Sequence, residues 1–192
     1  METTTFDLAP AAASVERVVA GVRDAQLCDP TPCEGTSVSG LLDHLVGLTT
    51  AFRMAAEKTV PGGGPQADGA SLAPDWRTRL PAQLDELVEA WRKPDAWDGV
   101  TEAGGVQMPA PLMAVVALDE LVVHGWDLAV ATGQQFAPDE DSVRRCLEFA
   151  ASFGDDPAAR AGLYGPVVPV PGDAPVLDRL LGATGRDPGW RP

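Results

Sequence analysis

The sequence lacks the features of a membrane or exported protein. No apolar run approaches the roughly 20 residues that a membrane-spanning helix needs. The N-terminal stretch METTTFDLAPAAASVERVV has neither a basic start nor an unbroken apolar segment, because Asp7, Pro10 and Glu16 interrupt it. We therefore expect a cytoplasmic protein without a membrane anchor.

Basic residues are also few. The chain has 14 Lys and Arg against 28 Asp and Glu, a net charge of −14, which repels nucleic-acid phosphates and anionic lipid headgroups. We expect neither as a partner. With 192 residues, 45% of them hydrophobic, the chain is long enough for one core and short for two. We predict a single domain over residues 1–192, in which residues 155–192 form an extended tail with one short helix.

Cysteine is scarce, and the number of cysteines is odd. Cys28, Cys33 and Cys146 are three cysteines in a chain without a secretory signal, so reduced thiols are expected rather than a disulfide framework. Cys28 and Cys33 lack Cys-x-x-Cys spacing and have two prolines between them, which makes a weak redox or zinc motif. Cys146 is expected to be a small buried apolar residue.

The chain also lacks a phosphate-binding loop, because the glycine run at 62–64 is not followed by Lys and Ser or Thr. Residues 60–72, VPGGGPQADGASL, instead predict a surface loop. A proline-punctuated extended segment, GLYGPVVPVPGDAP, follows much later, at residues 162–175.

What the sequence does have is apolar residues at three- and four-residue steps, the period of amphipathic helices. A short hairpin is expected around Gly104 and Gly105, and Pro81 predicts a kink or a break in one helix. The helices expected from this spacing together predict an all-α helical bundle. The helices are expected over Asp7–Leu27, Thr36–Lys58, Pro74–Lys93, Pro111–Gly133, Pro138–Phe153 and Pro175–Gly185.

The only two histidines fall in strongly apolar helical stretches. Glu120 and His124 are four residues apart, so they share one helix face, and His44 could reach the same point from an antiparallel helix. Two imidazoles and a carboxylate make a catalytic zinc ligand set. The alternative is a solvated Glu–His pair and a core histidine bonded to a carbonyl. Asp127 could accept the other ring N–H of His124, or be an exposed helix residue.

Three stretches, PTPCEGTSVSGLLDHLVG, DELVVHGWDLAVATG and YGPVVPVPGDAPVLDRLLGATGRDPGW, resemble the mycothiol-dependent maleylpyruvate isomerase-like proteins of the DinB/YfiT superfamily. The resemblance implies an up-down-down-up four-helix bundle, here with extra short C-terminal helices and an irregular tail. It also implies a divalent metal, zinc or alternatively nickel, held by His44, Glu120 and His124. Mycothiol is the implied co-substrate, and a homodimer is an open expectation because bundles of this kind often dimerise.

The sequence departs from the family pattern in two ways. Glu120 stands, as a glutamate does in the maleylpyruvate isomerases, where many members of the wider superfamily have a third histidine, and a carboxylate weakens the Lewis acidity of a bound ion. The separate C-terminal domain of the isomerases is replaced by the short tail, so their activity is not carried over.

Three functions stay open at this point. The first is a metal-dependent thiol S-transferase or isomerase-like enzyme acting on a small molecule. The others are a non-catalytic metal-binding bundle or sensor, and a metal-dependent hydrolase. No catalytic base is indicated by the sequence. Four arginines could contact a substrate carboxylate or simply lie on the surface: Arg53, Arg77, Arg79 and Arg160.

Overall fold

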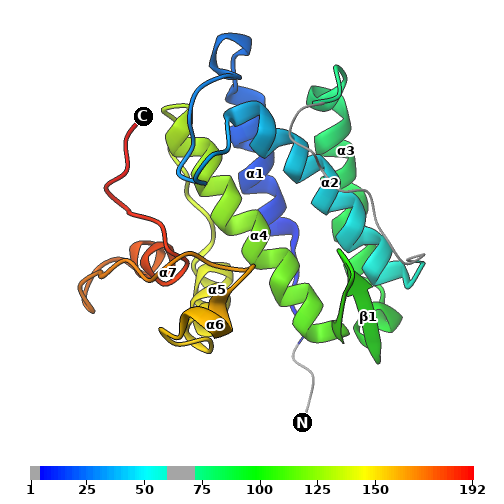
Figure 1. Ribbon diagram of the computed structural model, residues 1–192. Helices are drawn as coiled ribbons and strands as arrows, with labels where there is room; N and C mark the ends of the chain where they lie inside the picture. Colours follow the sequence, from blue (N-terminus) through cyan, green and yellow to red (C-terminus); the bar gives the residue numbers. More distant parts are fainter. Residues whose placement is uncertain (1–4, 60–71) are drawn as a thin grey trace.

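The computed structural model describes residues 5–59 and 72–192, and its main body is a ring of four helices (Figure 1). In this ring α1 and α2 each pack against both α3 and α4. Helices α1 and α4 run in one direction, and α2 and α3 run in the opposite one (Figure 1). The predicted up-down-down-up bundle is therefore confirmed. The four helices are α1 (Ala9–Gly21), α2 (Val38–Glu57), α3 (Trp76–Trp91) and α4 (Ala110–Ala131).

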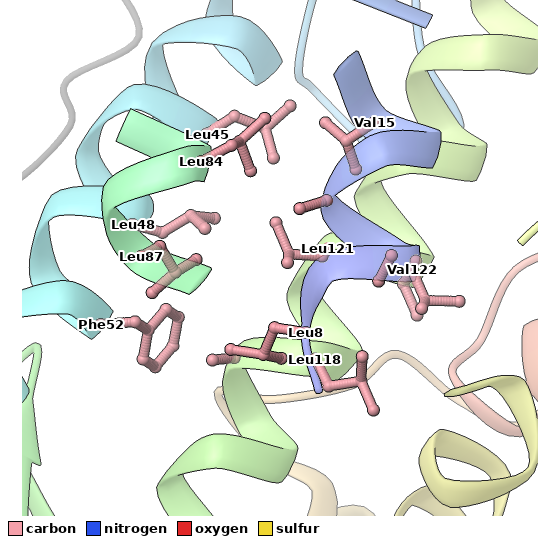
Figure 2. Close-up of a cluster of buried hydrophobic side chains, with 14 of the residues drawn as sticks. Leu8, Val15, Leu45, Leu48, Phe52, Leu84, Leu87, Leu118, Leu121 and Val122 are labelled. Carbon is pink, nitrogen blue, oxygen red and sulfur yellow. The ribbon is translucent and has the colours of Figure 1, made fainter. Parts of the chain in front are cut away.

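All four helices contribute to one apolar core (Figure 2). Helix α4 is the most deeply buried, because α1, α2 and α5 (Glu140–Ala151) all pack on it. A helix covered on several sides is apolar nearly all round, so each polar residue on it has to find a partner. The core side chains labelled in Figure 2 are Leu8, Val15, Leu45, Leu48, Phe52, Leu84, Leu87, Leu118, Leu121 and Val122.

Helix α1 ends earlier than the sequence predicts. It stops at Gly21 rather than near Leu27, and a short 3-10 helix, η1 (Asp24–Gln26), follows. The reason is a distant side chain: Gln134 Nε2 donates to the carbonyl of Val18 at 2.9 Å, the group that the next helical N–H would otherwise use. The Gln134 amide also fills the space beside Gly21, where a Cβ would lie only 2.0 Å from its Oε1.

Helices α2 and α3 match their predicted positions. The Ser37 hydroxyl accepts a hydrogen bond from the Gly40 N–H and caps α2, while Lys58 ends it with a φ of 53°. Pro81 lies inside α3 without breaking it. Its missing N–H removes one hydrogen bond near the helix start, and the fully buried Leu84 and Leu87 hold the helix on the bundle.

The bundle is completed at one end by the predicted hairpin. Strands β1 (Val100–Ala103) and β2 (Val106–Pro109) pair antiparallel, preceded by the 3-10 helix η2 (Pro94–Trp97). Gly104 and Gly105 join the strands with φ values of 58° and 82°, as a two-residue hairpin turn requires.

Helix α5 begins at Glu140 instead of at Pro138, because the Asp139 carboxylate accepts a hydrogen bond from the Ser142 N–H and caps it. Beyond α5 the chain forms a tail with two short helices, α6 (Pro157–Arg160), which was not predicted, and α7 (Val176–Ala183), which was. Helix α7 packs on α5.

Arg160 fastens this tail from inside. It is 2% exposed, and its guanidinium donates hydrogen bonds to the carbonyls of Gly154, Gly165 and Ala183. Its donors are therefore directed at the tail backbone, which leaves this candidate anion contact engaged within the fold.

Within the described ranges, no helix combines the length and the apolar character needed to cross a membrane. The loop predicted over residues 60–72, with the glycine run at 62–64, lies outside the described residues except for Leu72.

Candidate metal centre

Three side chains predicted from the sequence converge between α2 and α4. Glu120 Oε2 lies 3.3 Å from His44 Nε2 and 3.0 Å from His124 Nε2. The donor atoms of all three residues lie within 4.8 Å of one another. The two imidazole rings meet edge to face, with centroids 4.9 Å apart.

The core fixes this convergence. His44 directly precedes the fully buried Leu45 on α2, and Glu120 directly precedes the fully buried Leu121 on α4. Because α2 and α4 pack antiparallel, the first half of α2 faces the second half of α4. Side chains at the edge of the apolar interface therefore meet across it.

The charges at the site favour a bound cation. Burial disfavours the charged form of His124, but hydrogen bonds to the Asp127 and Glu120 carboxylates outweigh it and raise the pKa of His124 to about 10. Burial likewise opposes ionisation of Glu120, yet the hydrogen bonds and charges of His124 and His44 hold the pKa of that carboxyl well below its ordinary value. Without an ion, His124 is thus an imidazolium held between the carboxylates of Glu120 and Asp127. A divalent cation would replace the proton on its Nε2. Two imidazole nitrogens and one carboxylate oxygen are a donor set suited to zinc.

Asp127 lies on the other side of the His124 ring. It is fully buried, and its Oδ2 is 3.0 Å from His124 Nδ1 and 3.2 Å from Arg186 Nη2. When Nδ1–H donates to this carboxylate, the lone pair of Nε2 points to Glu120 and His44, so the ring presents its acceptor nitrogen to the centre.

The tail supplies two contacts that the sequence did not predict. Arg186 pairs with Asp127, and the Tyr164 hydroxyl donates to Asp119 Oδ2 at 2.8 Å. Both acidic residues flank the Glu120 and His124 pair on α4. Arg186 is 59 residues from Asp127 in the chain, and no local spacing links two such positions.

Asp119 should make the stability of the metal-free protein depend on pH. Burial raises its pKa from 3.8 to about 7, against the hydrogen bond from Tyr164. Between these values the unfolded chain is ionised and the folded one is protonated, so stability falls as the pH rises from about 4 to 7. Asp119→Asn removes this ionisation. We expect the difference in free energy of unfolding, variant minus wild type, to be on the order of 2 to 4 kcal/mol more positive at pH 8 than at pH 4, so that the variant gains stability relative to wild type as the pH rises.

Urea denaturation of both proteins with a chelator present, at the two pH values, measures this difference. The amide also changes the hydrogen bond with Tyr164, and this effect on stability is the same at every pH. An equal difference in stability between variant and wild type at both pH values would therefore contradict a raised pKa of Asp119.

A cavity of about 880 Å³ opens onto the three converging residues. Its walls are the loop Pro32–Ser37, the start of α2, and tail residues that include Leu163 and Arg186. His44 is the most accessible of the three, with 44% of its side chain exposed against 11% for His124. The four candidate arginines do not line this cavity, whereas Arg186 does. Arg53 pairs with Glu57 and Glu86, and Arg77 with Asp24.

Comparison with known proteins places this geometry in context. The chain is 28% identical over 171 residues to an uncharacterised protein of Mycobacterium tuberculosis, found in strains CDC 1551 / Oshkosh and ATCC 25618 / H37Rv, and the match covers 88% of this chain and 90% of the relative. Among solved structures, the crystal structure of the mycothiol-dependent maleylpyruvate isomerase superposes with a TM-score of 0.61 at 21% identity, over 79% of this chain and 76% of that one. A mutant of that enzyme superposes with a TM-score of 0.53 at 18% identity and the same coverage. These likenesses show a shared fold.

The sequence profile described as "Mycothiol maleylpyruvate isomerase N-terminal domain" matches residues 8–129, which run from the start of α1 almost to the end of α4. The matched stretch contains His44, Glu120 and His124 and is more than half of the chain. The chain therefore belongs to the mycothiol maleylpyruvate isomerase N-terminal domain family.

Proposed function

We propose that the protein is a metal-dependent enzyme that uses a low-molecular-weight thiol of the mycothiol type in S-transfer to, or isomerisation of, a small-molecule substrate. The proposed ligands are His44, Glu120 and His124, with zinc as the first candidate ion and nickel as the second. The observation that carries the proposal is the convergence of these three side chains on the wall of an open cavity of about 880 Å³. Family membership supports the choice of thiol.

A divalent ion in this position would lower the pKa of a thiol that binds it, so that a nucleophilic sulfur exists at neutral pH. The remaining work belongs to the chain. Asp127 accepts the Nδ1–H of His124 and holds the ring in the tautomer whose Nε2 faces the cavity. Arg186 balances the buried charge of Asp127 and is the one arginine of the described residues that lines the cavity, where it can attract an anionic group of a substrate.

The cavity favours an enzyme over a closed metal-stabilised bundle. A structural metal site is enclosed by protein ligands, whereas a catalytic one keeps a position open for substrate. Here His44 is nearly half exposed, and the space beside it is large enough for a thiol together with an electrophile.

The test is turnover of 1-chloro-2,4-dinitrobenzene by the purified zinc-loaded protein, followed by absorbance with and without mycothiol. We expect product to form only when both zinc and the thiol are present, and a chelator to abolish it. Zinc-dependent hydrolysis of ester or amide substrates at the same rate without thiol would instead support the hydrolase. Stoichiometric metal with neither activity, across electrophiles of several classes, would favour the non-catalytic bundle.

A further inference from the structure

Cys33 lines the same cavity as the candidate metal centre. Cys33 is partly buried on the loop that precedes α2, and this loop is held by its own backbone. The Thr36 N–H donates to the Cys33 carbonyl at 3.0 Å, and the Thr31 N–H donates to the Thr36 carbonyl at 3.2 Å. The thiol therefore has a fixed place on the cavity wall.

Cys33 is part of a cluster with two residues of the candidate centre. Its Sγ, a ring nitrogen of His124 and a carboxylate oxygen of Asp127 all lie within 4.8 Å of one another. Arg186 completes the cluster: burial opposes its charge, but Asp127 and Cys33 are among the groups that raise the pKa of its guanidinium.

The cluster also has unused hydrogen-bonding capacity. Among the described residues, Asp127 Oδ1 and Arg186 Nε are buried polar atoms without a hydrogen-bond partner. Asp127 is fully buried, so its orphan oxygen is costly unless a ligand supplies a donor. Arg186, which carries the second unpartnered atom, lines the cavity together with Cys33, so a polar molecule seated there would lie against the guanidinium.

We propose that Cys33 is a covalent modification site that takes a low-molecular-weight thiol as a mixed disulfide from the symmetrical disulfide of that thiol. This inference rests on the proposed function for the identity of the thiol. The Cys33 sulfur attacks one sulfur of the disulfide, a new S–S bond forms, and the old one breaks. One thiolate leaves and takes a proton from solvent, so the exchange needs no further oxidant.

The adduct has a direct consequence for the site. A thiol-sized group attached at Cys33 occupies the cavity onto which His44, Glu120 and His124 open. Substrate access is then blocked until a reductant or excess free thiol reverses the exchange. The protein would thus switch off when its thiol pool becomes oxidised.

The two other cysteines are internal controls. Cys28 is exposed and Cys146 is fully buried, and neither lines this cavity. Accessibility alone predicts that Cys28 reacts first. Recognition in the cavity predicts that Cys33 does, although it is the less exposed of the two.

The experiment incubates the purified full-length protein with excess mycothiol disulfide, then maps adducts by intact-protein and peptide mass spectrometry. Parallel reactions use Cys28→Ser, Cys33→Ser and glutathione disulfide. We expect one adduct per chain, at Cys33, formed at least about tenfold faster than at Cys28 and unchanged in Cys28→Ser. Faster reaction of Cys33 with glutathione disulfide than with mycothiol disulfide would support the same modification site with a different thiol.

Equal or faster modification of Cys28, or a Cys28–Cys33 disulfide in place of an adduct, would overturn the inference. The outcome is separate from that of the proposed function, because the adduct is measured in zinc-loaded and chelator-treated protein alike. A Cys33 adduct without turnover refutes only the enzyme, and turnover without an adduct refutes only the modification site.

Discussion

His124→Ala is expected to abolish stoichiometric zinc binding, lowering zinc affinity at least about 100-fold. His124 is the least exposed of the three proposed ligands: its Nε2 lies 3.0 Å from Glu120 Oε2, and its Nδ1 contacts the buried Asp127. Without the ring, the two remaining donors come from different helices, and Asp127 loses its partner on α4. The measurement is elemental analysis of purified wild type and variant, followed by competition with a chromogenic chelator.

The carboxylate offers a matched comparison. Glu120→Gln keeps the size of the side chain but removes the charge that a divalent ion needs, so zinc affinity should again fall steeply. Glu148→Gln removes the same charge from an exposed position on α5 and should leave zinc binding unchanged. Stoichiometric zinc retained in His124→Ala would refute the ligand assignment, and equal losses in both glutamine variants would point to net charge instead of coordination.

The bundle and the convergence of His44 with α4 follow from local sequence patterns. Apolar residues at helical spacing fix which face of α2 and α4 is buried, and a histidine or glutamate next to a fully buried leucine is carried to the edge of that interface. The four-residue step between Glu120 and His124 then places both side chains on one face. Periodicity predicts the buried face of each helix, whereas the helix directions that set α2 antiparallel to α4 are predicted by the family resemblance.

The cavity walls depend on contacts that local patterns do not encode. Arg186 reaches Asp127 across 59 residues, and Gln134 ends α1 across 116. Both bonds require the tail, or the turn after α4, to fold back on the bundle, and the sequence gives no period for such docking. Likewise, the spacing of Cys33 to Cys28 carries no information on the neighbours of Cys33 in the fold, which are His124 and Asp127.

Asp127→Asn is expected to lower the free energy of unfolding of the metal-free protein by about 3 to 5 kcal/mol. The amide oxygen still accepts a hydrogen bond from His124 Nδ1–H, but Arg186 loses the charge it pairs with while only 12% of its side chain is exposed. An unpaired buried guanidinium is the costly product. Zinc affinity should fall about 10- to 100-fold, because a neutral partner holds the imidazole less firmly and makes it less basic.

A double-mutant cycle separates the two effects. Arg186→Met removes the other charge, and in Asp127→Asn/Arg186→Met no buried charge of this pair is left unpaired, so stability should recover by about 1 to 3 kcal/mol relative to Asp127→Asn. Zinc affinity should stay low in the double variant, since it depends on the carboxylate behind His124 and not on the ion pair. Urea denaturation with a chelator gives the stability, and chelator competition gives the affinity. Additive losses of stability would mean that Asp127 and Arg186 act independently. Recovery of zinc affinity along with stability would mean that Asp127 contributes only to folding and not to zinc binding.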